Sequence, residues 1–246
     1  FFDGLGMVKL GAFTVFTSFI SLATLYYVRV SIRDTMGIDY VGYYAAATTL
    51  TITYMGLIFS SMAADYFPKL SAINKDNQAL NKAILDQTKI ILLLGTPLIL
   101  LMFTFSDYII PILYSKEFIL SRVLLLWMLL AVFFQLVSFP IGYVFLAKSK
   151  GKIFIFTQSQ WNIIFIIGAF LSLKFDYGLE GIGIAFSTAY LLGLVVNILI
   201  IKRVTSLKYD STTKQYILFL GLSVIAYLYY SLNYSGLVAL VIKFSA

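Results

Sequence analysis

The sequence contains no cysteine and no histidine, and only 12% of its 246 residues are charged. Without cysteine the chain can form no disulfide and offers no thiolate. Without histidine it lacks the commonest metal ligand and the only side chain that ordinarily titrates near neutral pH. These absences argue against a zinc site and against acid–base catalysis by histidine. We therefore expect no cofactor, no metal and no enzymatic activity.

Apolar residues make up 61% of the chain, and its mean hydropathy is +0.93. Soluble domains carry roughly 25% charged residues, so the composition predicts an integral membrane protein and argues against a nucleic-acid partner. Backbone polar groups in lipid must be paired within their own segment, which makes an all-α fold the expectation. Apolar runs long enough to span a bilayer predict about eight transmembrane helices, at 8–32, 41–64, 88–106, 119–146, 153–173, 180–201, 215–232 and 235–246.

Lysine and arginine are unequally divided between the connections of these helices. They are frequent near the N-terminus and in 68–87, 148–152 and 202–214, and they are scarce in 107–117 and 174–180. Cytoplasmic connections of membrane proteins carry the excess of positive charge, so we expect the N-terminus in the cytoplasm. All connections are short, which leaves no room for a soluble catalytic domain.

Two arginines, Arg29 and Arg33, lie at the outer end of the first apolar run. Their spacing of four places both on one helix face. A charge on a membrane helix is costly when it faces lipid, and the guanidinium fork matches phosphate oxygens. The pair therefore suggests an anionic ligand. Alternatively, Arg33 extends to the interface and pairs with Asp34 or Asp39.

The longest connection carries apolar residues at helical spacing between 79 and 85. This pattern predicts a short surface helix along the cytoplasmic interface, with Asp76 as its N-cap. Two outer connections share a pattern of glycine, aliphatic residue and acid, at Gly37–Gly42 and at Gly178–Gly183. Such a pattern suits the tight corner of a helical hairpin.

Few polar residues lie within the predicted spans. Gln135 and Asn197 are mid-span, and Gln158, Gln160 and Asn162 are near one end of theirs. Hydrogen bonds between helices explain most such residues, and belts at the two membrane interfaces explain most Tyr and Trp residues. No Asp or Glu occupies the middle of a span, which disfavours a cation-coupled antiporter.

The stretch from Val41 to Ser71 has a glycine–tyrosine pair at its outer start and Asp65-Tyr-Phe-Pro-Lys-Leu-Ser71 at its inner end. It closely resembles the polysaccharide (O-antigen) flippases of the multidrug/oligosaccharidyl-lipid/polysaccharide (MOP) exporter superfamily. Further similarity lies in Ile109–Phe118, Phe145–Phe154 and Gly178–Phe186. The resemblance covers about residues 5–204, and its strength is the order of the motifs.

The resemblance implies two six-helix lobes around a cavity that opens alternately to the two faces of the bacterial cytoplasmic (inner) membrane. Such proteins move an oligosaccharide linked to undecaprenyl pyrophosphate to the outer leaflet, for surface polysaccharides such as lipopolysaccharide O-antigen. Residues 1–204 would form the second lobe and 205–246 an additional helical pair. We expect the chain to be a fragment that lacks the first lobe.

The two lines of reasoning meet at the arginines, which we expect to hold the pyrophosphate. The full set of candidate substrate-binding residues is Arg29, Arg33, Lys9, Tyr43, Tyr54 and Gln135. Expected partners are the lipid-linked oligosaccharide, membrane lipids and other polysaccharide assembly proteins. The main alternative is a drug or cation antiporter of the same superfamily; a membrane glycosyltransferase, polymerase or ligase and a non-transporting scaffold are less favoured.

Overall fold

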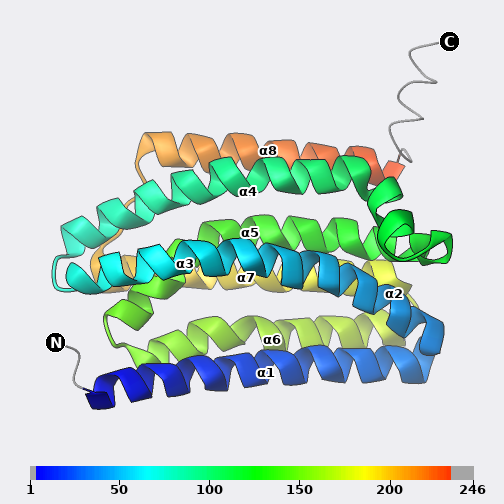
Figure 1. The fold of residues 1–246 in the computed structure, drawn as a ribbon, viewed down its shortest axis with the longest axis horizontal. Helices are drawn as coiled ribbons and strands as arrows, with labels where there is room; N and C mark the ends of the chain where they lie inside the picture. Colours follow the sequence, from blue (N-terminus) through cyan, green and yellow to red (C-terminus); the bar gives the residue numbers. More distant parts are fainter. Residues whose placement is uncertain (1–3, 234–246) are drawn as a thin grey trace, which may run out of the picture.

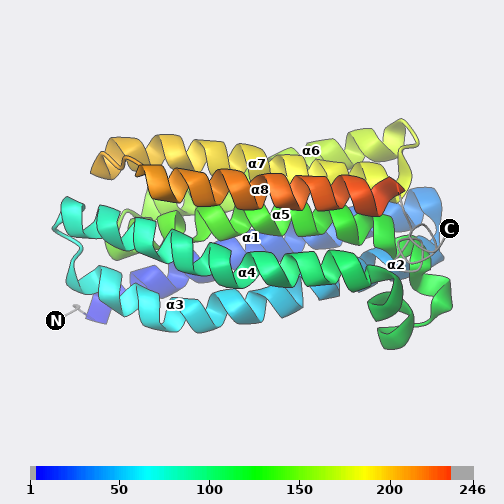
Figure 2. The same ribbon diagram turned by 90° about the horizontal axis from the view of Figure 1, so that it is seen from above.

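The computed structural model describes residues 4–233, which form a bundle of long helices (Figure 1). Seven helical segments in this range are long and apolar enough to cross a membrane. They run back and forth between the two ends of the bundle (Figures 1 and 2). The all-α membrane class predicted from composition is confirmed, and the predicted span 235–246 lies outside the described residues.

The elements follow one another with short connections. In chain order they are α1 (Gly4–Met36), α2 (Ile38–Thr48), the π-helix η1 (Thr49–Thr53), α3 (Tyr54–Ala72), α4 (Asn77–Leu113), the 3-10 helix η2 (Lys116–Leu120), α5 (Ser121–Ala147), α6 (Gly151–Lys174), α7 (Gly178–Thr205) and α8 (Ser211–Asn233).

Helix α5 lies at the centre of the bundle and packs against α2, α3, α4, α6, α7 and α8. It is apolar on all sides, which is typical of a helix surrounded by other helices. Leu124, Leu125 and Leu126, which point in directions about 100° apart around α5, are all 0% exposed. Helix α1 is at the edge and packs mainly against α2 and α6. The core is therefore built around α5, and α1 presents one whole side to the surroundings.

The surface helix expected between 79 and 85 is not a separate element. These residues form the first turns of α4, which continues to Leu113. Leu80, Ile84 and Thr88 are fully buried on one face, so the packing face runs into the span without a break. The N-cap is confirmed: the Asp76 carboxylate accepts hydrogen bonds from the backbone N–H groups of Gln78 at 2.8 Å and Ala79 at 3.1 Å.

Both glycine corners have the backbone conformation that favours glycine. Gly37 joins α1 to α2 with φ of 104°, and Gly178 begins α7 with φ of 60°. Side chains with a Cβ rarely adopt positive φ. The hairpin-corner interpretation of the repeated glycine pattern is thus confirmed at both positions.

A π-helix interrupts the second span, where a regular helix over 41–64 was expected. Its wider turn, Thr49–Thr53, lies beside α5. The Thr51 hydroxyl donates to the Ala47 carbonyl at 2.8 Å and lies 3.8 Å from the sulfur of Met128 on α5. Single π-turns inside α-helices are frequent at functional sites.

Candidate functional site

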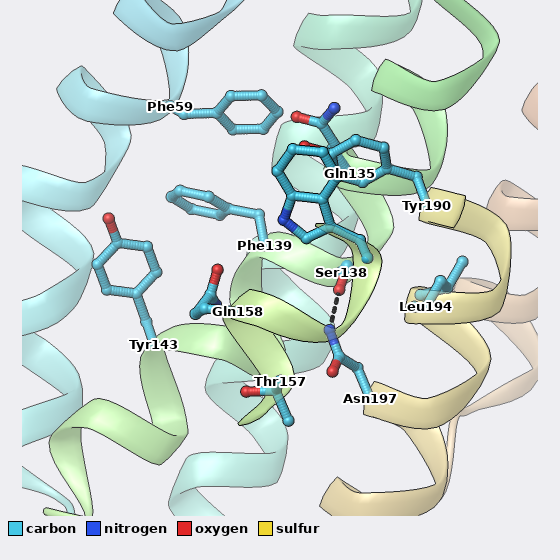
Figure 3. A pocket seen from close by; sticks show the side chains of 12 residues that line it. Phe59, Gln135, Ser138, Phe139, Tyr143, Thr157, Gln158, Tyr190, Leu194 and Asn197 are labelled. Carbon is cyan, nitrogen blue, oxygen red and sulfur yellow. Dashed lines mark hydrogen bonds between the residues drawn. The ribbon is translucent and has the colours of Figure 1, made fainter. Parts of the chain in front are cut away.

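A cavity of about 250 Å³ lies between α3, α5, α6 and α7 (Figure 3). All the residues that line it are apolar, aromatic, amide or hydroxyl residues. They are Phe59, Gln135, Ser138, Phe139, Tyr143, Thr157, Gln158, Trp161, Tyr190, Gly193, Leu194 and Asn197. Among the predicted substrate-binding residues, only Gln135 belongs to this lining.

Each of three helices contributes a set of three side chains, and every set includes residues three or four positions apart. In α5 they are Gln135, Ser138 and Phe139, in α6 Thr157, Gln158 and Trp161, and in α7 Tyr190, Leu194 and Asn197. This spacing places the members of each set on one helix face. On each helix an amide or hydroxyl residue shares one face with an aromatic residue or a leucine. This repeated pattern could have indicated the cavity from the sequence, but it is not visible when each polar residue is considered alone.

A chain of hydrogen bonds joins α5, α6 and α7 at one side of the cavity. The Gln160 amide donates to the Asn197 Oδ1 at 3.0 Å, and the Asn197 amide donates to the Ser138 hydroxyl at 2.6 Å. Gln160 also donates to the Gly193 carbonyl at 3.2 Å. The predicted bonds between helices are confirmed for Gln160 and Asn197. Paired in this way, these groups hold the three helices in a fixed register.

Gln135 and Gln158 behave differently from Gln160. Within the described part of the chain neither side-chain amide has a hydrogen-bond partner, although both line the cavity. In Figure 3 the Gln135 amide lies near Phe59, and the Gln158 amide lies between Tyr143 and Thr157. A polar group inside a membrane bundle is costly without a partner. These two amides are therefore available to water or to a ligand.

Aromatic rings form much of the remaining wall. Phe59 and Phe139 stack at 5.3 Å between ring centroids, and Trp161 and Tyr190 stack at 4.8 Å. The sequence predicts that interface belts explain most Tyr and Trp residues. Trp161 and Tyr190 are exceptions, because they line this cavity, and composition does not distinguish the two locations.

Arg29 and Arg33 lie on the outward side of α1. Val28 and Ile32 beside them are fully buried, whereas both arginines are exposed. Arg33 pairs with Asp34 at 2.9 Å, and both side chains are more than half exposed. The pairing that the sequence allowed for Arg33 is confirmed. Arg29, by contrast, forms no ion pair among the described residues.

The other three predicted residues are dispersed. Tyr43 packs edge-on against Tyr40 and Phe118 at the end of the bundle that holds η2. Tyr54 is 49% exposed and directly follows the π-helix. Lys9 belongs to the early turns of α1, and its side chain falls outside the described part. No single cavity gathers these residues in the described range.

Tyr44 and Tyr190 differ in their surroundings. The Tyr44 hydroxyl on α2 is buried without a hydrogen-bond partner in the described structure, whereas Tyr190 lines the cavity.

Comparison with known families adds one finding. Residues 5–122 match the family model described as polysaccharide biosynthesis protein. The matched segment is a little under half of the chain and runs from α1 into the first turn of α5. It includes Arg29, Arg33, Lys9, Tyr43 and Tyr54.

The match associates the N-terminal part of the chain with the synthesis or export of polysaccharides. It supports the polysaccharide-related part of the resemblance that the Val41–Ser71 motif carries. No curated protein and no solved structure gives a significant match. Within residues 4–233, no three His, Cys, Asp or Glu residues lie close enough together to hold a metal ion.

Proposed function

We propose that the chain is one lobe of a flippase that moves an oligosaccharide linked to undecaprenyl pyrophosphate from the cytoplasmic to the outer leaflet. It would act as a transporter and not as an enzyme, in the bacterial inner membrane, with the N-terminus in the cytoplasm. The observation that carries the proposal is the match of residues 5–122 to polysaccharide biosynthesis proteins, because the matched segment contains the arginine-bearing helix α1.

The outward face of α1 suits a glycolipid. Val15, Phe19, Leu22 and Tyr26 form an exposed stripe at spacings of three and four residues, each at least 67% exposed. The stripe continues to Arg29. An apolar surface followed by a guanidinium matches a molecule with a hydrocarbon chain and a phosphate head group.

Arg29 is the better phosphate ligand of the two arginines. Arg33 already has a carboxylate partner, whereas the Arg29 guanidinium has none in the described structure. A charged hydrogen bond to phosphate contributes about 1.5–3 kcal/mol. Each 1.4 kcal/mol corresponds to a factor of about ten in affinity.

The test is export of surface polysaccharide in a flippase-deficient strain complemented with the full-length protein. We expect Arg29→Ala to reduce surface glycan at least tenfold, with lipid-linked glycan accumulating in the inner leaflet and protein levels unchanged. Arg29→Lys should give an intermediate result, because the charge stays but the fork is lost.

Arg203→Ala is the matched control, since Arg203 is an exposed arginine in the last turn of α7. It should leave export unchanged. Normal export by Arg29→Ala would refute the ligand role of Arg29. Failure of the unaltered protein to export any glycan, despite correct insertion, would refute the flippase proposal, and assays of drug efflux would then test the antiporter.

A further inference from the structure

The cavity between α3, α5, α6 and α7 is polar without being charged. None of its lining side chains is Asp, Glu, Lys or Arg. An ion enclosed there would lose its hydration without gaining a counter-charge, which is strongly unfavourable. The lining therefore selects against pyrophosphate and against a cation, and favours a neutral ligand with hydrogen-bonding groups.

The free polar groups of the cavity are amides. Each of Gln135 and Gln158 offers two N–H donors and a carbonyl acceptor. A sugar hydroxyl can both donate and accept a hydrogen bond. A glutamine amide can therefore pair with it, either as acceptor through its carbonyl oxygen or as donor through its N–H groups. The Gln160–Asn197–Ser138 chain is already paired, which leaves Gln135 and Gln158 as the amides of the lining that can bind a ligand.

The aromatic walls complement the other surface of a sugar. A pyranose ring presents C–H groups on its face, and these pack favourably on the electron-rich faces of aromatic rings. The lining contains two stacked pairs, Phe59 with Phe139 and Trp161 with Tyr190, and Figure 3 shows Phe59 and Phe139 next to each other. Amides for the hydroxyls and rings for the C–H face thus occur together.

The size of the cavity limits the ligand. Pockets for drug-sized molecules measure roughly 300–1,000 Å³, and this one measures about 250 Å³. Its volume is enough for about one ring, and the rest of a longer glycan would extend out of it.

We infer that this cavity binds one neutral pyranose ring through Gln135, Gln158 and the Trp161–Tyr190 pair. The chemistry of the ring follows from the cavity itself. The source of the ring, a sugar of the lipid-linked substrate, rests on the proposed function.

Trp161 provides a direct test, because the chain has only two tryptophans and the other, Trp127, is not in the cavity lining. Within these 246 residues, Trp127→Phe leaves Trp161 as the single tryptophan and therefore the fluorescent reporter. We would titrate this protein, purified in detergent, with methyl glycosides of glucose and N-acetylglucosamine, and with inorganic pyrophosphate for comparison.

We expect a saturable change in Trp161 fluorescence with at least one glycoside at about 1 mM, the affinity typical of a ligand of this size. Pyrophosphate should cause none. Adding Gln135→Leu and Gln158→Leu should weaken glycoside binding about tenfold, whereas Gln215→Leu on the exposed part of α8 should not. If the double variant does not insert, Gln158→Leu alone should weaken binding several-fold.

No saturable change with any glycoside, or equal affinity in the leucine variants, would overturn the inference. The export assay separates it from the proposed function. Glycoside binding in a protein that exports no glycan would refute the flippase and leave the sugar site intact. Glycan export at the normal level by the leucine variants, with glycoside binding lost, would assign the site to a free sugar and refute the lipid-linked source.

Discussion

Asp76 is the residue whose local role is most clearly defined. Its carboxylate accepts two of the backbone N–H groups that a helix leaves unpaired at its start. We expect Asp76→Ala to lower the free energy of unfolding by about 1 kcal/mol, measured by denaturation of the purified protein in detergent. Asp86→Ala on the exposed side of the same helix is the control and should have no effect. An equal loss in both variants would contradict the cap.

Local features of this kind can be predicted from the sequence, as Asp76, Gly37 and Gly178 illustrate. The set of residues that line the cavity could not be predicted in this way. Gln135, Gln158 and Gln160 are the same residue type in similar apolar surroundings, yet only Gln160 is paired with a neighbouring helix. The difference depends on how α5, α6 and α7 are rotated about their axes, which a single sequence does not determine.

At the level of elements, one arginine joins three helices. Arg122 on α5 forms an ion pair with Asp107 on α4 at 2.5 Å and donates to the Ser231 carbonyl on α8 at 2.8 Å. Both charged side chains are at most 20% exposed. Removing one partner of such a pair leaves an uncompensated charge.

We expect Asp107→Leu to destabilise the protein by about 3 kcal/mol, and Asp107→Leu with Arg122→Leu to recover most of this loss, because apolar replacement of both partners is often nearly neutral. Thermal unfolding in detergent measures both. A double variant less stable than Asp107→Leu would mean that the arginine is needed mainly for its bond to α8.

The π-helix gives a second prediction at this scale. A π-turn holds one more residue than an α-helical turn, so deleting Ile52 should restore a regular helix and keep the register of α2 and α3. Deleting Leu57, which lies in the regular helix α3, would instead rotate the residues before it by roughly 100° relative to the residues after it. We expect normal yield and a single gel-filtration peak for the Ile52 deletion and aggregation for the Leu57 deletion. Aggregation of both would show that the π-turn itself is required for folding.

The positions of the spans could be predicted, because an apolar run long enough to cross a membrane is almost always a transmembrane helix. Irregular geometry within a span could not be predicted. Thr49–Thr53 carries no proline or glycine that would indicate a π-helix, and the length of α4 follows from burial of Leu80 and Ile84 against other helices. Such features arise from packing and not from local propensity.

The molecule as a whole should be insensitive to pH near neutrality, since it has no histidine. The α7–α8 connection is tied to α4 through Asp210, which lies 3.1 Å from Lys89. Hydrogen bonding to Thr213 and the nearby Lys89 lower the pKa of Asp210. A carboxylate with a lowered pKa stabilises the fold above the pKa of the unfolded chain, about 3.9, and loses this effect as pH falls through the folded value.

We therefore expect the difference in melting temperature between the unaltered protein and Asp210→Asn to be constant from about pH 8 to pH 5, and to vanish in stronger acid. Thermal unfolding across this range measures it. A difference that changes between pH 6 and pH 8 would require a titrating group other than this carboxylate.

Helix α1 packs mainly against α2 and α6, and it ends at Gly37, whose backbone conformation is unusual. Arg33 and Arg29 lie about one turn and about two turns before this corner. The corner therefore keeps both arginines close to one end of the bundle, and any tilt of α1 about Gly37 would displace its N-terminal end most.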